Sequence, residues 1–247
     1  MNSLAIGLVA VCLLLMLAFL AIGRRQSQRR LRSIKAFEAL RRTIDLSVED
    51  GSRMQVSLGR GGLLGPQSAA ALAALSLLRQ VAETASDSDL PPIATSGEAT
   101  LALLSQDTLR SACLRLGIGD QFHKGLGAVT GLTPFSYGAG TMPLVLDQHV
   151  SASALIGNFG SELGLITSAS QRQQGFALGG SDSLSAQALL FAGADQPLIG
   201  EELYATGAYT GAGAAHEASL RAQDVLRWLL ILALVGLALG NLFGLAL

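Results

Sequence analysis

Two long stretches without a charged side chain lie near opposite ends of this 247-residue chain, and they restrict its fold more than any other feature. Residues 4–23 read LAIGLVAVCLLLMLAFLAIG, and residues 228–247 read WLLILALVGLALGNLFGLAL. About twenty apolar residues suffice for a helix to cross the hydrocarbon core of a bilayer. The first stretch has neither the basic leader nor the small-residue cleavage site of a signal peptide, which favours a retained anchor. We therefore expect two transmembrane helices.

Basic residues adjoin both apolar stretches on the side of the loop between them. Arg221 and Arg227 precede the second stretch, and a cluster of arginines follows the first. The cluster that we expect at the membrane surface, against anionic headgroups, consists of Arg24, Arg25, Arg29, Arg30 and Arg32. The positive-inside rule then predicts a cytoplasmic loop with both termini outside.

Glycines recur every fourth residue in the second stretch, at Gly236, Gly240 and Gly244. All three fall on one face of a helix, where the missing side chain lets another helix approach closely. We expect helix–helix contact on this face, either with the first stretch or with a neighbouring copy. The alternative is that these glycines have no partner, because glycine is common in membrane helices.

The loop between the stretches is acidic, which argues against nucleic acid as a partner. Residues 43–220 contain seven basic and sixteen acidic side chains, whereas a nucleic-acid surface must be positive. Charged residues make up only 14% of the whole chain, against roughly 25% in a typical soluble protein. We expect a lipid bilayer and other membrane proteins as partners, including further copies of this chain.

The loop repeats one pattern: a short apolar run, a turn of small residues and then helical spacing of apolar residues. The apolar runs and turns read RMQVSLGRGG, PPIATSG, ASALIGNFG and GFALGGSD. Strands that alternate with helices predict an α/β domain, Rossmann-like with a mainly parallel sheet, over residues 51–220. Residues 24–50 form a basic segment and a helix leading into it, and residues 221–247 a connecting helix and the second span. The less regular segment AVTGLTPFSYGAGTMPLVLDQHV is interpreted as one further strand with a long connection.

The turn VSLGRGGLLGP, residues 56–66, resembles a phosphate-binding loop but departs from it. Its glycines give G-x-G-x-x-x-G, one residue longer than a dinucleotide fingerprint, and the second strand does not end in the required acid. A Walker G-K-[ST] is also missing. Two interpretations stay open: a turn that lets a helix pack on the sheet, or a phosphate or nucleotide site. The residues of the second interpretation are Gly59, Arg60, Gly61 and Gly62, with Arg60 as counter-charge at a helix amino end.

A second turn, LGGSDSLSAQ, precedes another predicted helix. Ser181 or Asp182 as an N-cap accounts for it, and shared ligand binding with the first turn is the alternative. We find neither G-x-S-x-G nor H-E-x-x-H, and the three histidines lie far apart. We therefore predict no catalytic residues, no metal ligands and no cofactor.

Three segments, VSLGRGGLLGPQSAAAL, LIGEELYATGAY and SLRAQDVLRW, resemble a family of bacterial membrane proteins known only as a domain of unknown function. The resemblance implies a two-span protein with an α/β body, and we expect this protein in a bacterial inner membrane. It implies no activity and no functional residues. The function we expect is a membrane-anchored structural or scaffold protein that self-associates or packs against partner proteins. A nucleotide- or phosphate-binding sensor or enzyme that uses the residue 59–62 loop is the alternative.

Overall fold

The computed structural model describes residues 3–23, 32–85, 90–148 and 150–242, which divide into two compact units. One unit contains the helices α1 (Ser3–Gly23) and α9 (Ala214–Leu242). The other runs Arg32–Gly211, and we call it the α/β unit. It includes α2 (Lys35–Glu49), whose apolar face is buried in the core. The domain limits expected from the sequence stay predictions.

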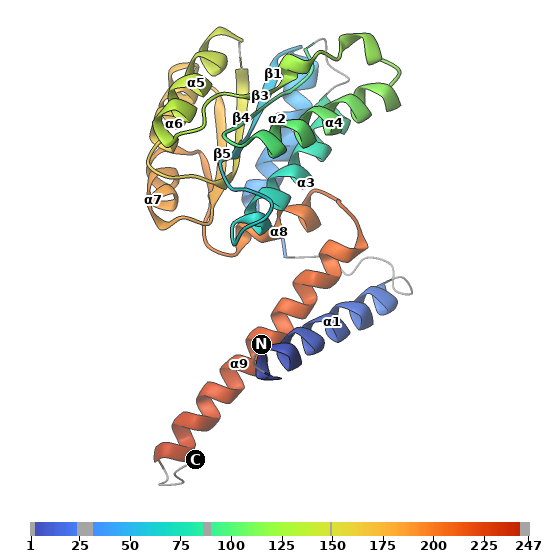
Figure 1. The fold of residues 1–247 in the computed structure, drawn as a ribbon, viewed down its shortest axis with the longest axis vertical. Helices are drawn as coiled ribbons and strands as arrows, with labels where there is room; N and C mark the ends of the chain where they lie inside the picture. Colours follow the sequence, from blue (N-terminus) through green and yellow to red (C-terminus); the bar gives the residue numbers. More distant parts are fainter. Residues whose placement is uncertain (1–2, 24–31, 86–89, 149, 243–247) are drawn as a thin grey trace. The chain divides into compact units, whose positions relative to one another are not determined.

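The α/β unit is built on a sheet whose six described strands are all parallel, in the order β3-β2-β1-β4-β5-β6 (Figure 1). This is the strand order of many doubly wound dinucleotide-binding domains, and the likeness is one of topology alone. The prediction of an α/β fold with a parallel sheet is confirmed. The strands are β1 (Arg53–Gly59), β2 (Ile93–Ser96), β3 (Gly127–Val129), β4 (Val150–Asn158), β5 (Phe176–Ser181) and β6 (Gln196–Leu198).

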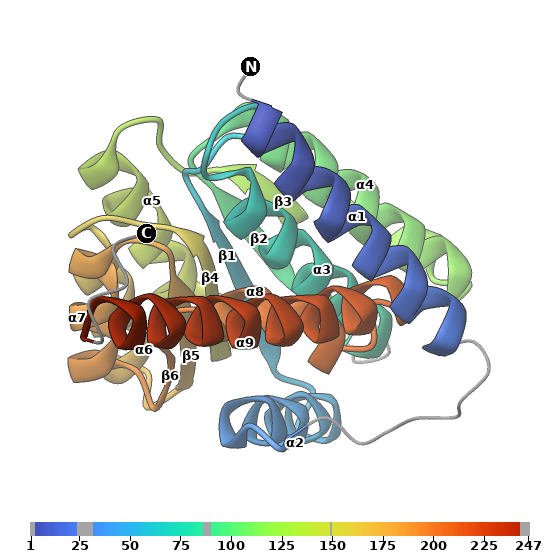
Figure 2. The ribbon, with the colours of Figure 1, turned by 90° about the horizontal axis from the view of Figure 1, so that it is seen from below.

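Helices cover both faces of the sheet (Figures 1 and 2). One layer holds α2, α3, α4 and α8, and the other holds α5, α6 and α7. Right-handed crossovers between parallel strands place consecutive helices on one face until the strand order reverses. The remaining bounds are α3 (Ser68–Ala85), α4 (Ala99–Arg115), α5 (Pro134–Asp147), α6 (Leu163–Arg172), α7 (Leu184–Gly193) and α8 (Glu202–Tyr209), with 3-10 turns at Gly119–Gln121 and Lys124–Leu126.

The central strand β1 is buried on both faces, as expected where helices cover a parallel sheet on both sides. Met54, Val56 and Leu58 belong to the main apolar core. The alternate side chains are polar, and Ser57 meets Tyr137 of α5 there. The two faces of β1 therefore differ, with an apolar layer on one side and buried hydroxyl groups on the other.

The segment between β3 and β4 contains the helix α5, so the predicted long connection is wrong. Gly138, Gly140 and Pro143 lie inside this helix and hide its pattern in the sequence. Both glycines allow close packing, because a Cβ at Gly140 would lie 2.1 Å from the Thr130 carbonyl oxygen. Thr133 and Ser136 form a capping box at the amino end. This cap stabilises the start of a helix that contains residues with poor helix propensity.

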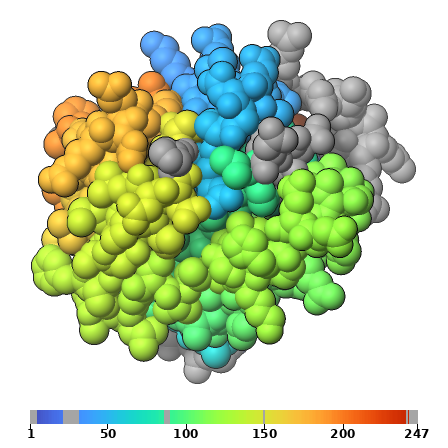
Figure 3. Space-filling view, turned by 90° about the horizontal axis from the view of Figure 1, so that it is seen from above, coloured from blue at the N-terminus to red at the C-terminus, as the bar shows by residue number. Residues whose placement is uncertain are grey.

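The chain enters and leaves the α/β unit at neighbouring points. The Tyr209 hydroxyl, at the end of α8, donates a hydrogen bond of 2.5 Å to the Arg32 carbonyl oxygen. The Tyr209 ring stacks on Phe37 of α2 with 5.0 Å between ring centroids. From there α2 runs to the amino-terminal edge of the sheet, which is the edge seen in Figure 3. The helix ends before Gly51, whose φ is 62°.

In the other unit, α1 contacts α9, which is one continuous helix of 29 residues. This helix runs without a break from Ala214 into the second apolar stretch. Within α9, Ala214–Leu239 is long and apolar enough to cross a membrane, and it is largely exposed. In α1, the described apolar helix Ala5–Ala21 is shorter than a span requires. The structure therefore supports one candidate span, and the second stays a prediction from the sequence.

Candidate functional site at the carboxyl-terminal edge of the sheet

The carboxyl-terminal ends of β1 and β4 lie side by side where the strand order reverses. In open parallel sheets, ligands bind in the crevice outside the strands at this switch point. The chain after β1 carries Arg60, and β5 ends at Ser181. We call residues 158–162 the β4 loop, which begins at Asn158, the last residue of β4. These three segments form the candidate site.

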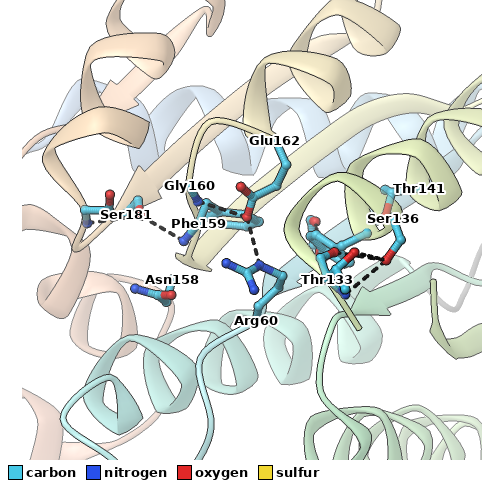
Figure 4. Close-up of polar contacts among 12 residues, drawn as sticks. Arg60, Thr133, Ser136, Thr141, Asn158, Phe159, Gly160, Glu162 and Ser181 are labelled. Carbon is cyan, nitrogen blue, oxygen red and sulfur yellow. Dashed lines mark hydrogen bonds and ion pairs between the residues drawn. The ribbon is translucent and has the colours of Figure 1, made fainter. Parts of the chain in front are cut away.

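Arg60 forms an ion pair with a buried acid of the β4 loop (Figure 4). Its Nε donates a hydrogen bond of 3.0 Å to Glu162 Oε1, and the Gly160 amide donates to the same oxygen at 2.9 Å. The Arg60 side chain is 25% exposed, whereas that of Glu162 is 0% exposed. Glu162 Oε2 is buried and has no hydrogen-bond partner among the described residues. The positive charge that the sequence leaves unexplained is therefore balanced inside the protein.

The second predicted turn also bonds to the β4 loop. The Asn158 side-chain amide donates to Asp182 Oδ1 at 2.7 Å, and the Phe159 backbone amide donates to Ser181 Oγ at 3.2 Å. The N-cap position of α7 is Ser183, so the N-cap role expected for Ser181 or Asp182 is wrong. Both residues tie β5 to the β4 loop instead.

Two glycines of the first turn are required by close packing. Gly59 has a φ of 73°, and a Cβ there would lie 2.3 Å from the Asn158 carbonyl oxygen. A Cβ at Gly61 would lie 2.9 Å from the Asn158 Cβ. Gly62 has open space around it. The helix α3 begins only at Ser68, so eight residues separate it from the end of β1.

A buried hydroxyl cluster lies inside the sheet below this edge. The Tyr137 and Ser57 hydroxyls share a hydrogen bond, and the Tyr137 hydroxyl also donates to the Thr95 carbonyl oxygen at 3.4 Å. Burial raises the pKa of the Tyr137 hydroxyl, although its hydrogen bonds with Ser57 and Thr95 act in the opposite direction. The group is therefore a neutral hydrogen-bonding partner at physiological pH, and it fixes α5 against the central strands.

The acid closest to the end of β2 is used in a helix cap. Glu98 lies at the N-cap of α4 and accepts a hydrogen bond of 2.8 Å from the Leu101 amide. Burial raises the pKa of Glu98, but hydrogen bonds from the Leu101 and Thr100 groups outweigh it and lower the pKa below its usual value. A dinucleotide site would need such an acid to bind a ribose hydroxyl. Among the described residues, no three His, Cys, Asp or Glu side chains are grouped as a metal site requires.

Only part of the predicted membrane-facing set falls in the described segments. Gly236 and Gly240 lie in α9, and a Cβ at Gly236 would have nothing within 4 Å. Of the arginine cluster, Arg32 is described and exposed at the start of the α/β unit. The other members lie outside the described residues: Gly244, Arg24, Arg25, Arg29 and Arg30.

The family model described as "Domain of unknown function (DUF6754)" matches residues 1–245. The chain belongs to this family. No curated protein and no solved structure matches the chain. For this member of DUF6754, the family thus adds no activity to the geometry. The residues that the sequence did not single out are Asn158 and Glu162, since no motif marks them and their partners lie 24 and 102 residues away.

Proposed function

We propose that this protein is a membrane-anchored scaffold, which self-associates or packs against partner proteins at the cytoplasmic face of a bacterial inner membrane. In this proposal both apolar stretches cross the bilayer, the α/β unit is cytoplasmic and both termini lie outside. The length and composition of α9 support one span, and the basic residues beside both stretches support the orientation.

The observation that carries the proposal is how the polar groups of the candidate site are used. Arg60 pairs with buried Glu162, and Asp182 accepts from Asn158. A ligand that recruited these groups would have to break bonds within the protein, and breaking a buried pair is costly. Such an edge favours a rigid module over a site that exchanges ligands.

Open space beside Gly236 of α9 supports self-association. Although α1 contacts α9, no described residue lies within 4 Å of a Cβ placed on Gly236. A second α9 can approach closely at such a position. We expect the full-length protein in nanodiscs or mild detergent to be oligomeric by light scattering.

The variant Gly236→Ile should shift the oligomer towards monomers by about tenfold in dissociation constant, as expected for the loss of a helix contact worth ~1–2 kcal/mol. Ala238→Ile is the matched control, because residue 238 points away from the glycine face. A strictly monomeric wild-type protein would refute the self-association. Equal effects of the two substitutions would refute the glycine face as its site.

A second candidate is a nucleotide- or phosphate-binding sensor or enzyme, and the strand order favours it. Its switch point lies beside Arg60, which is partly exposed. We expect a nucleotide at 100 times its dissociation constant to stabilise the protein by about 2.7 kcal/mol, and Arg60→Lys to reduce this gain. Unchanged melting temperatures with a panel of nucleotides and inorganic phosphate would eliminate this candidate.

A further inference from the structure

Exposed apolar side chains gather at the carboxyl-terminal edge of the sheet. Seven large apolar residues in the described part of the α/β unit are at least 60% exposed. Two of them, Leu114 and Phe191, lie near the ends of α4 and α7, towards the amino-terminal edge. The other five follow the carboxyl-terminal ends of strands: Leu64, Leu103, Leu132, Phe135 and Leu184. Exposed apolar groups that gather on one surface mark an interaction site.

The same edge has few charges that face water. Residues 61–78, which include the loop after β1, contain no charged side chain, and neither do residues 125–146, which include the loop after β3. Arg60 is paired with Glu162, and Glu98 caps α4. The partners of Arg60 and Glu98 lower the cost of removing these two charges from water, and the acids Glu201 and Glu202 at the start of α8 are further charges of this edge.

Both connections to the apolar stretches leave the α/β unit on this side. The helix α2 runs antiparallel to β1 and therefore begins towards the carboxyl-terminal edge, while three residues separate the end of β6 from the start of α8. Tyr209 joins the two points through its hydrogen bond to Arg32 and its stack on Phe37. The segment before Arg32 contains the arginine cluster, which attracts anionic headgroups.

In the proposed anchoring, a short connection holds the α/β unit near the membrane. The second apolar stretch begins at residue 228, and the charged part of α9 before it, residues 214–227, extends ~21 Å as a helix. Gly211, the last residue of the α/β unit, precedes α9 by three residues.

We propose that the carboxyl-terminal edge of the α/β unit is a lipid-binding surface, whose exposed leucines and Phe135 enter the headgroup–acyl boundary of the membrane that anchors the chain. Amphipathic protein surfaces bury their apolar groups ~5–10 Å deep in this boundary. The proposal rests on the membrane anchoring proposed above and adds the bilayer as the partner of this edge. It also gives the exposed side chains a role that the internal bonds of the site do not provide.

The test uses the full-length protein in vesicles of zwitterionic and anionic phospholipids. Cys12 and Cys113 are first replaced by Ser and Ala, and an environment-sensitive fluorophore is attached at one new cysteine. Leu64→Cys and Leu184→Cys report on the carboxyl-terminal edge, and Leu114→Cys and Phe191→Cys are controls at exposed positions towards the other edge. Lipids with a nitroxide near the top of the acyl chain quench only fluorophores at that depth.

We expect loss of emission at positions 64 and 184 but not at positions 114 and 191. Equal quenching at all four positions would overturn the proposal. So would protection of positions 64 and 184 from aqueous iodide without quenching by lipid, because another copy or protein would then cover the edge.

The fluorescence of Trp228, the single tryptophan, distinguishes failure of the lipid-binding proposal from failure of the membrane anchoring. Brominated lipids should quench Trp228 if α9 spans the bilayer. Quenching of Trp228 alone refutes the lipid-binding edge and leaves the anchored scaffold intact. Lack of Trp228 quenching refutes both proposals.

Discussion

The two edges of the sheet place their charges differently. At the carboxyl-terminal edge, Glu162 is fully buried against Arg60. Towards the amino-terminal edge, Glu83 near the end of α3 pairs with Arg79 and Arg115, and all three side chains are more than one third exposed. Solvent screens the second arrangement and leaves it weak, whereas burial makes the first sensitive to loss of one partner. The comparison indicates that the carboxyl-terminal edge is a fixed surface and the opposite edge an ordinary solvated one.

The largest difference between the edges should come from removing one acid at each. Glu162→Ala should lower the free energy of unfolding by about 3 kcal/mol, at the low end for a buried pair because Arg60 is partly exposed. Glu83→Ala is the control and should cost less than about 1 kcal/mol. Urea unfolding of the full-length protein in detergent, followed by circular dichroism, measures both. Similar costs would mean that the buried pair contributes no more than a surface pair.

A backbone comparison should give the next largest effect. Gly59 at the carboxyl-terminal edge and Gly117 after α4 have φ angles of 73° and 75°. Only Gly59 has a backbone atom in the way of a Cβ, whereas Gly117 has nothing within 4 Å. We expect Gly59→Ala to cost about 2–3 kcal/mol and Gly117→Ala about 1 kcal/mol in the same unfolding assay. If the two variants are equally stable, the contact between the β1 turn and the β4 loop is looser than described.

The smallest expected difference concerns two tyrosine hydroxyls. Tyr137→Phe removes a buried hydroxyl that bonds Ser57 and should cost about 1–2 kcal/mol at neutral pH. Tyr209→Phe removes a hydroxyl in an exposed hydrogen bond and should cost less, at about 0.5–1 kcal/mol. Thermal unfolding of both variants tests this order.

The pH dependence gives Tyr137 a separate signature. Its folded pKa is raised above the ordinary value of 10.0, so its contribution is fully present below pH 10.0 and is lost as pH rises through the folded pKa. The melting temperature of the wild-type protein should therefore fall above pH 10 more steeply than that of Tyr137→Phe. If the melting temperatures of both proteins fall equally with pH, ionisation of the Tyr137 hydroxyl is not linked to unfolding.

The sequence predicts the elements whose patterns are local. The alternation of apolar runs, small turns and helical spacing correctly indicates β1, β2, β4 and β5 with the helices that follow them. It misses α5, because glycines needed for close packing lie inside that helix and weaken its pattern. It also misses β6, a strand of three residues that is too short to show a period.

The candidate site could be predicted only in part. Strand-to-helix order places Arg60 and Ser181 at one edge of the sheet, as the second interpretation of the turns expected. The partners of these residues could not be found, because Glu162 reaches Arg60 only through the pairing of β1 with β4. A single acid in the segment NFGSE has no spacing that marks it as the counter-charge of an arginine 102 residues away.

The most direct test of the difference between the edges is the orientation of the sheet on a membrane. Electron cryomicroscopy of the full-length protein in a lipid nanodisc, with a bound antibody fragment to add mass, measures it in one experiment. We expect the carboxyl-terminal ends of the strands to face the bilayer, with Leu64 and Leu184 at headgroup level and the amino-terminal edge in water. A map with the amino-terminal edge towards the lipid, or with another copy between the carboxyl-terminal edge and the bilayer, would contradict the account.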